Sequence, residues 1–505
     1  MVNYECPRCG YETPQRQKYD RHVQNKTPCS DKYATLTKAY AEAFSALTRI
    51  NATLTRIHED TTRLLPAAAA AAPATNTVVL SATSSPPPSA TAAAAAAAAT
   101  PETPAAGLTF IDLFCGIGGF HQALTQLGAH CVLACDIDAK CREVYEANYG
   151  LKPYEDVTKL DTATMPDFDV LCGGFPCQAF SHSGKQGGFE DTRGTLFRDC
   201  ARILKDKQPK YFLMENVKNL KGHDEGRTWA TIYRSFTEAG YVTYENPVVL
   251  SPHQLGVPQH RERVLLMGIR KDLVTATLPE MDALSPPPCS IRSILMDDAA
   301  ATATAGTALT SHDTGILDCW EELVQHFKTV AVKLPTFPMW SEEWDGAYPL
   351  NEDEKTPEWK AKFLTQNRAF YREHIAFLGP WLVRARATPK FVGAKSKFEW
   401  QAGAFQAEDS LWRLLFQFRP SGIRVKRATY SPALVALAQI VYVGEKRRKL
   451  CPREVARLQS FPDSFKLPSA PAVAYKQFGN SVNVEVIKFA MRHILTKMAS
   501  ASPTV

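Results

Sequence analysis

The sequence has no long apolar run and no apolar leader. No stretch of its 505 residues approaches the roughly 18 consecutive apolar residues that cross a bilayer. The N-terminus shows no charged stretch followed by an apolar one, so it carries no sign of a secretory signal. Its 13 cysteines are an odd number, and without secretion we expect mostly free thiols. These features predict a soluble, intracellular protein without a membrane partner, and they do not distinguish nucleus from cytoplasm.

The chain also lacks a strong charge of either sign. Its 58 Lys and Arg residues against 52 Asp and Glu residues give a formal net charge of +6. This mildly basic balance permits a nucleic-acid partner without requiring one. A length of 505 residues with 45% hydrophobic content favours about two to four domains with sizeable cores.

The first 31 residues hold four soft metal ligands. Cys6 and Cys9 form a Cys-x2-Cys pair, and His22 and Cys29 follow after twelve and six intervening residues. This spacing is close to that of zinc fingers, although the last interval is slightly long. Because so short a segment can bury little core of its own, we predict a zinc-finger-like module with a structural Zn²⁺. The alternative is a flexible N-terminal segment with scattered thiols. The sequence does not indicate whether the module would bind DNA or a protein.

Two further segments precede the main globular region. In residues 32–65, apolar side chains recur at alternating spacings of three and four. This pattern predicts a long helix, either a coiled coil that makes a homodimer through residues 33–64 or one amphipathic helix lying on another domain. Residues 66–107 are rich in Ala and Pro and predict a disordered linker.

The most informative stretch is residues 169–197. An apolar run leads to Gly173-Gly174 and then to Phe-Pro-Cys-Gln, which places Cys177 just beyond a predicted strand. Open α/β sheets carry their chemistry at this point. A free cysteine is more often core filler, however, and it becomes a nucleophile only where its thiolate is favoured. On this stretch alone both interpretations stay open.

A glycine turn opens the same region. A predicted strand over 110–114 runs into Cys-Gly-Ile-Gly-Gly-Phe and a predicted helix over 121–127. The next predicted strand ends at Asp136, an acid that can bind the ribose hydroxyls of a nucleoside cofactor. Such a turn serves NAD, FAD or S-adenosylmethionine. His121 stands where the dinucleotide pattern Gly-x-Gly-x-x-Gly has its last glycine, which counts against a pyrophosphate cofactor.

Three short motifs follow one another along the chain. They are Pro176-Cys177-Gln178, Glu215-Asn216-Val217 and Gln259-x-Arg261-x-Arg263. In this order and spacing they resemble the DNA (cytosine-5) methyltransferases, and residues 475–482 resemble the last motif of that family. The resemblance implies an α/β fold, with a Rossmann-like S-adenosylmethionine-dependent domain on a mixed, mostly parallel sheet and a smaller target-recognition domain.

The implied reaction is methyl transfer from S-adenosylmethionine to C5 of cytosine in a specific sequence of double-stranded DNA. Cys177 would add to C6 of a base flipped out of the duplex. Glu215 would donate a proton at N3, Arg261 would hold cytosine O2 together with the Glu215 carboxylate, and Arg263 would reach a phosphate. Taken alone, Glu215 also fits a helix cap or an ion pair. The expected substrate-binding residues, partly in a glycine-rich lid after Cys177, are Gln178, Ser181, Gln186, Asn216 and Gln259.

The resemblance also implies a cofactor pocket. Asp136 would hold the ribose and Asp156 the adenine amino group, while Ile137 would cover the adenine where the family often has an aromatic residue. The full expected set is Phe114, Gly116, Gly118, Gly119, Asp136, Ile137, Asp156, Val157, Pro176, Leu196, Asn480 and Val482.

The predicted catalytic domain is in two parts, residues 108–270 and 446–496. The target-recognition domain would occupy residues 271–445, whose seven tryptophans we expect in its core, and residues 497–505 would form a disordered tail.

Two alternative functions are open, an RNA (tRNA) cytosine-5 methyltransferase and a catalytically silent DNA-binding homologue. The large insert and the missing Cys-Phe-Thr sequence after Val217 disfavour the first, and the intact motifs disfavour the second. Restriction-modification, viral and chromosomal enzymes would share these motifs.

Overall fold

The computed structural model describes residues 4–5, 12–13, 104–176, 196–274, 278, 280–281, 284–297, 301, 306–346, 357–434 and 439–499. The predicted zinc ligands, the 33–64 helix and the 66–103 part of the linker lie outside these residues, as do Cys177, Gln178, Ser181 and Gln186. The chain divides into two compact units, 1–95 and 96–505. In the first, strands β1 (Tyr4–Glu5) and β2 (Glu12–Thr13) pair antiparallel.

The second unit contains a seven-stranded sheet with the order β4-β3-β5-β6-β10-β7, and β8 also pairs with β10. Strands β4, β3, β5 and β6 are parallel, whereas β10 is antiparallel to β6, β7 and β8. The predicted mixed α/β sheet is therefore confirmed. The strands are β3 (Thr109–Leu113), β4 (His130–Cys135), β5 (Val170–Gly173), β6 (Tyr211–Val217), β7 (Tyr241–Thr243), β8 (Val248–Leu250) and β10 (Arg263–Arg270).

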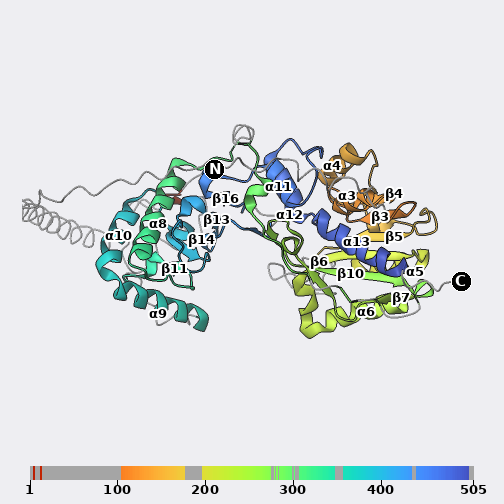
Figure 1. Ribbon diagram of the computed structural model, residues 1–505, viewed down its shortest axis with the longest axis horizontal. Helices are drawn as coiled ribbons and strands as arrows, with labels where there is room; N and C mark the ends of the chain where they lie inside the picture. The colour runs from red at the N-terminus through yellow and green to blue at the C-terminus, as the bar shows by residue number, and fades with distance from the viewer. Residues whose placement is uncertain are drawn as a thin grey trace, which may run out of the picture. The chain divides into compact units, whose positions relative to one another are not determined.

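Alternate side chains of these strands enter two separate apolar cores, because successive residues of a strand point to opposite faces of the sheet. On one face, Phe110 and Val170 pack with helices α3 (Gly119–Gln126) and α13 (Val484–Ala499). On the other, Ile111 and Leu171 pack with α5 (Leu196–Lys207) and α6 (Arg227–Glu238). Figure 1 shows these helices on the two sides of the sheet, and α4 (Ala139–Tyr149) follows β4. The sheet is thus buried on both faces.

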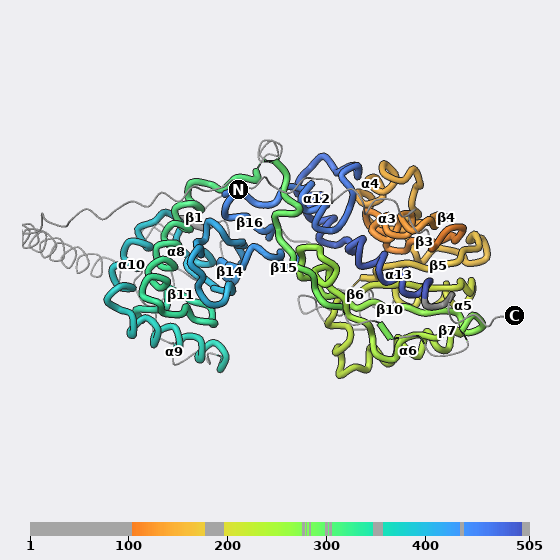
Figure 2. Tube along the Cα trace, in the orientation of Figure 1, coloured from red at the N-terminus to blue at the C-terminus, as the bar shows by residue number. Residues whose placement is uncertain are grey.

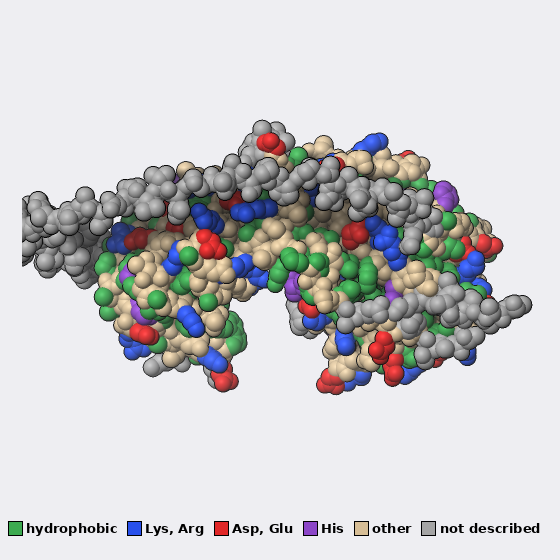
Figure 3. All heavy atoms as spheres, viewed as in Figure 1, with side chains coloured by type: hydrophobic (Ala, Val, Ile, Leu, Met, Phe, Trp, Pro, Cys, Tyr) green, Lys and Arg blue, Asp and Glu red, His purple; other side chains and the backbone are tan. Residues whose placement is uncertain are grey.

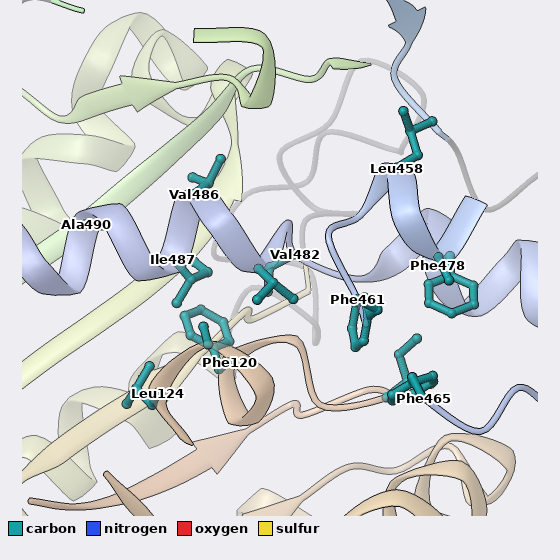
Figure 4. Close-up of a cluster of buried hydrophobic side chains, with 14 of the residues drawn as sticks. Phe120, Leu124, Leu458, Phe461, Phe465, Phe478, Val482, Val486, Ile487 and Ala490 are labelled. Atoms are coloured by element: carbon teal, nitrogen blue, oxygen red, sulfur yellow. The ribbon is translucent and has the colours of Figure 1, made fainter. Parts of the chain in front are cut away.

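The C-terminal helix α13 lies against α3, the first helix that follows β3, as the trace in Figure 2 shows. In Figure 4, Phe120 and Leu124 of α3 point toward Val482 and Ile487. Beside them, Phe461, Phe465 and Phe478 form a group with ring centroids 4.7 to 6.0 Å apart. The phenylalanines belong to the segment that holds α11 (Pro452–Leu458) and α12 (Pro471–Asn480). Residues of the C-terminal segment and of α3, the helix after the glycine turn, therefore share one apolar core.

A third apolar core lies between residues 306 and 426. Trp320, Trp344 and Trp381 are each at most 2% exposed and form core as predicted. Trp359 is 61% exposed, so the prediction that all seven tryptophans lie in the core is wrong for this residue. A six-stranded sheet of order β11-β12-β14-β13-β16-β17 borders it. The elements are α8 (Ser311–Thr329), α9 (Glu358–Glu373), α10 (Ile375–Ala387), β11 (Met339–Trp340), β12 (Lys397–Trp400), β13 (Leu415–Arg419), β14 (Gly422–Lys426), β16 (Tyr442–Val443) and β17 (Arg448–Lys449).

The charged side chains match the modest net charge. On the face in Figure 3, Lys and Arg are interspersed with Asp and Glu and do not gather into one basic patch. No helix within the described ranges is both long and apolar enough to span a membrane.

A buried ion pair joins β17 to α11. Arg448 and Glu454 are 1% and 0% exposed at their side chains, and both guanidinium Nη atoms donate to the carboxylate at 2.8 Å. The same carboxylate accepts from the backbone N–H groups of Met296 and Cys451. Removing one partner of such a pair leaves an uncompensated buried charge, which is far more costly than losing an exposed pair.

We expect Glu454→Gln to lower the free energy of unfolding by about 3–5 kcal/mol at neutral pH. Urea unfolding of the full chain measures this loss. The control is Asp463→Asn, which breaks the Arg457–Asp463 pair, whose carboxylate is 59% exposed; it should cost less than about 1 kcal/mol. Equal losses in the two variants would contradict a special role for the buried pair.

Candidate active site

A cavity of about 340 Å³ opens at the carboxyl edge of the parallel strands. Its walls come from the residues that follow β3, β4 and β5, from Glu215 near the end of β6, and from the segment 477–482. The cavity falls within the usual range for cofactor sites. The same edge carries the residues that the sequence motifs singled out.

Eleven of the twelve expected cofactor residues line this cavity. They are Phe114, Gly116, Gly119, Asp136, Ile137, Asp156, Val157, Pro176, Leu196, Asn480 and Val482. Gly118 is the exception. It lies against the ring of Tyr149, where an added Cβ would come within 2.2 Å of a ring carbon, and the Tyr149 hydroxyl donates to its carbonyl at 2.9 Å. Gly118 therefore serves close packing of the turn and is not among the described residues that line the cavity.

The turn is held in shape by Asp136. Its carboxylate accepts from the backbone N–H of Gly116 at 2.7 Å and from that of Asp138 at 2.8 Å. Burial raises the pKa of Asp136, and these two hydrogen bonds partly oppose that effect. Phe114, just before the turn, has a left-handed backbone with φ of 54°. Asp136 thus fixes the glycine turn while lining the cavity.

The outer wall combines an apolar and an acidic residue. Ile137 is 81% exposed, which is unusual for so apolar a side chain and leaves its surface available to a ligand. Asp156 accepts from the backbone N–H of Thr158 at 3.0 Å and from its hydroxyl at 2.7 Å, and these bonds lower the pKa of Asp156. The wall therefore offers dispersion contact and a carboxylate side by side.

The opposite wall comes from the C-terminal segment. An added Cβ on Gly119 would lie 2.6 Å from Val482 Cγ2 and 2.9 Å from Ser481 Oγ, so only glycine allows this close approach. Ser481 and Gln477 also line the cavity, and the sequence motifs had not singled them out. Gln477 Nε2 donates to the carbonyl of Lys140 at 3.0 Å, which ties this wall to α4.

Glu215 and Arg263 form an ion pair inside the cavity. Arg263 Nε lies 2.9 Å from Glu215 Oε1, and the side chains are 20% and 13% exposed. They come from neighbouring antiparallel strands, where Arg263 lies opposite Val217 and Glu215 opposite Leu265. A half-buried carboxylate held by a guanidinium can be oriented toward a substrate in the cavity.

The structure pairs Glu215 with Arg263, where the sequence had predicted Arg261, and Arg261 lines the same cavity. Residues 261 and 263 would share one face of a continuous strand, but β10 begins only at Arg263. Arg261 lies before the strand and is 4% exposed, and it donates to three backbone carbonyls. Arg263 therefore takes the place next to Glu215 that the sequence had assigned to Arg261.

Two expected substrate residues are buried away from the cavity lining. Asn216 is 1% exposed, and its Nδ2 donates to the carbonyl of Phe175 at 3.2 Å. Gln259 is 0% exposed and lies in β9 (Gln259–His260), which pairs with β15 (Ser431–Pro432). Asn216 thus fixes the backbone two residues before Cys177. An added Cβ on Gly174 would lie 3.9 Å from Glu215 Oε2, so the same backbone passes beside Glu215.

A buried polar cluster packs against the glycine turn, and no sequence motif had indicated it. The His121 ring stacks on Tyr149 at 3.8 Å between centroids, and its Nδ1 lies 2.7 Å from the Tyr145 hydroxyl. Burial, with a smaller contribution from His130, lowers the pKa of His121 to about 4. Burial also raises the pKa of nearby Asp112 well above its usual range. His121 is therefore neutral in the folded protein at physiological pH.

This burial predicts a loss of stability in mild acid. Below about pH 6.5 the unfolded chain binds a proton at His121 that the folded chain binds only near pH 4. Stability from this group is complete above pH 6.5 and declines as pH falls, by about 3 kcal/mol in total. Urea unfolding between pH 7 and 4.5 should show a smaller pH dependence in His121→Gln than in wild type. The exposed control His312→Gln should keep the wild-type dependence; an unchanged slope in His121→Gln would contradict the assignment.

Comparison with known proteins agrees with this site. The model of the family "C-5 cytosine-specific DNA methylase" matches residues 108–496. The chain is 32% identical over 480 residues to Type II methyltransferase M.AluI of Cellulosimicrobium cellulans, covering 77% of this chain and 92% of that protein. It is 34% identical over 388 residues to Type II methyltransferase M.HhaI of Haemophilus parahaemolyticus, covering 77% and 94%. The match includes both parts of the chain that border the cavity.

The motifs, the mixed sheet and the cavity at its carboxyl edge thus agree with a match that spans most of the chain. The predicted resemblance is confirmed, and the chain belongs to the C-5 cytosine-specific DNA methylase family.

Proposed function

We propose that the chain transfers a methyl group from S-adenosylmethionine to C5 of cytosine in a specific sequence of double-stranded DNA, with Cys177 as its nucleophile. The observation that carries this proposal is the Glu215–Arg263 pair, which lies in the cavity beside the backbone that leads to Cys177. A carboxyl group and a guanidinium at this place suit a base that gains charge on its ring during the reaction.

The residues around the cavity fit S-adenosylmethionine. Asp136 would accept from the ribose hydroxyls, because each of its oxygens accepts one backbone bond and keeps a further acceptor site. Asp156 would accept from the adenine amino group, and Ile137 would cover the adenine ring. Gly119 lets the backbone approach the ligand closely. When bound, S-adenosylmethionine supplies an electrophilic methyl group on sulfur.

The remaining chemistry is assigned to the residues of the chain. The target base must leave the duplex, because neither C5 nor C6 is accessible in a stacked pair. The Cys177 thiolate adds to C6, which makes C5 nucleophilic. Glu215 donates a proton toward N3 as charge develops there, and Arg263 orients Glu215 and can reach cytosine O2. After methyl transfer a base removes the C5 proton, and Cys177 is released.

Other parts of the chain have proposed roles as well. Cys6, Cys9, His22 and Cys29 would bind a structural Zn²⁺, and the antiparallel β1–β2 pair flanks the Cys-x2-Cys sequence, as in a zinc-binding hairpin. Within the described residues no group of side chains could hold a metal ion. Residues 33–64 would form a coiled coil, and residues 271–445 would recognise the DNA sequence. The names of the relatives are consistent with a role in restriction-modification.

The test is methyl transfer from labelled S-adenosylmethionine to a pool of unmethylated duplex DNA and to matched RNA. We expect label in DNA, and 5-methylcytosine as the labelled nucleoside after digestion. Label in RNA alone would replace the proposal with an RNA cytosine-5 methyltransferase. No label in either, with intact cofactor binding, would favour a silent DNA-binding protein.

A further inference from the structure

Arg261 is a buried cation that holds backbone carbonyls from two distant segments. Its Nη1 donates to Leu434 at 2.7 Å and to Gly479 at 3.1 Å, and its Nη2 donates to Ser481 at 3.0 Å. A guanidinium presents its N–H donors in one rigid plane, so these three carbonyls are fixed relative to one another. A lysine ammonium at this position has three donors on a flexible stem and no such plane.

Two of these carbonyls belong to the wall of the cofactor cavity. Gly479 and Ser481 both line it, and Ser481 Oγ comes within 2.9 Å of the position that a Cβ on Gly119 would occupy. A shift of this segment would therefore change the space available to the cofactor.

The third carbonyl, that of Leu434, belongs to the segment that connects strands β14 and β16 of the six-stranded sheet. Leu434 follows β15, which pairs parallel with β9, and Ser431 N–H donates to the carbonyl of Pro258 at 2.8 Å. This segment lies between β14 and β16 of the proposed recognition domain. Arg261 is two residues from Arg263, so one short stretch of chain contacts the cofactor wall, the segment that holds Leu434, and Glu215.

We propose that Arg261 is a positioning residue that couples the cofactor wall to the segment leaving the recognition domain. Through it, binding of the cofactor and binding of DNA strengthen each other. By linkage the factor is the same in both directions. The inference rests on the proposed function, because it takes the cavity as the S-adenosylmethionine site and residues 271–445 as the DNA-binding domain.

The experiment compares Arg261→Lys and Arg261→Met with wild type and with the matched control Arg263→Lys, all in the full chain. Calorimetry gives the Kd of S-adenosylhomocysteine without DNA. The Kd of a pool of unmethylated duplexes is then measured with and without S-adenosylhomocysteine. In both Arg261 variants we expect the cofactor Kd to rise about tenfold or more, since charged hydrogen bonds to the wall are lost. The gain in DNA affinity caused by S-adenosylhomocysteine should fall toward onefold.

Arg263→Lys should keep the cofactor Kd within about twofold and lower kcat instead, because Arg263 pairs with Glu215 and the carbonyl of Glu262 and does not hold the carbonyls of Gly479 and Ser481. If Arg261→Met does not fold, Arg261→Lys carries the test, since it retains the buried charge. An Arg261→Lys protein with wild-type cofactor Kd and wild-type coupling would overturn the inference, even if its Tm were lower. If wild type bound no S-adenosylhomocysteine, the proposed function would fail first, and the inference with it.

Discussion

Glu215→Gln is expected to lower kcat for methyl transfer by about 10²–10⁴-fold, the usual contribution of a positioned general acid. The substitution keeps the shape of the side chain and its place next to Arg263, but an amide cannot donate and recover a proton at N3 of cytosine. The Kd of S-adenosylmethionine should change by less than about threefold, because the cofactor residues on the other walls are untouched. Single-turnover methylation of duplex DNA measures the chemical step directly.

The matched control is Glu262→Gln. Glu262 is a carboxylate next to Arg263 in the chain, but it pairs with Lys218 at 2.7 Å and is absent from the cavity lining. Its kcat should stay within about twofold of wild type, as an exposed ion pair contributes little. Equal losses of kcat in the two variants would show that kcat depends on negative charge near Arg263 and not on a proton donor at residue 215.

Much of this site follows from local sequence rules. The glycine turn, Asp136 one strand later and the Pro-Cys-Gln motif each stand at a strand end, and parallel strands bring their carboxyl ends to one edge. Eleven of the twelve cofactor residues that the family resemblance implied line one cavity. The wall made by Asn480 and Val482 was expected only from the family resemblance, because periodicity does not show that distant ends of a chain meet.

Where the positions of predicted site residues differ from expectation, the cause is long-range packing at element ends. The alternation of Arg261 and Arg263 indicated a shared face, but the strand starts between them, and carbonyls of the C-terminal segment enclose Arg261. Asn216 and Gln259 were expected at the substrate, yet both are buried in contacts with other segments. The ring of Tyr149 occupies the space beside Gly118, where a cofactor contact was expected.

Cys177→Ser should abolish methyl transfer, with a loss of at least about 10³-fold, because a serine hydroxyl at neutral pH is a much weaker nucleophile than a thiolate. Cofactor binding should persist, since Cys177 is needed for addition to the base and the expected cofactor residues Asp136 and Asp156 are unchanged in the variant. A variant that kept methylating at more than a tenth of the wild-type rate would exclude covalent catalysis by this cysteine.

The most direct measurement is covalent trapping on duplex DNA that contains 5-fluorocytosine, with S-adenosylmethionine present. After methyl transfer, C5 carries fluorine in place of the proton that a base must remove before Cys177 can be released. The enzyme therefore stays attached to C6 of the base. Wild type should form a denaturant-stable complex that depends on S-adenosylmethionine, with the crosslink at Cys177 by peptide mapping, and Cys177→Ser should form none. Methylation of ordinary cytosine in duplex DNA without any trapped complex, or a crosslink at another residue, would contradict the assignment of Cys177 as the nucleophile.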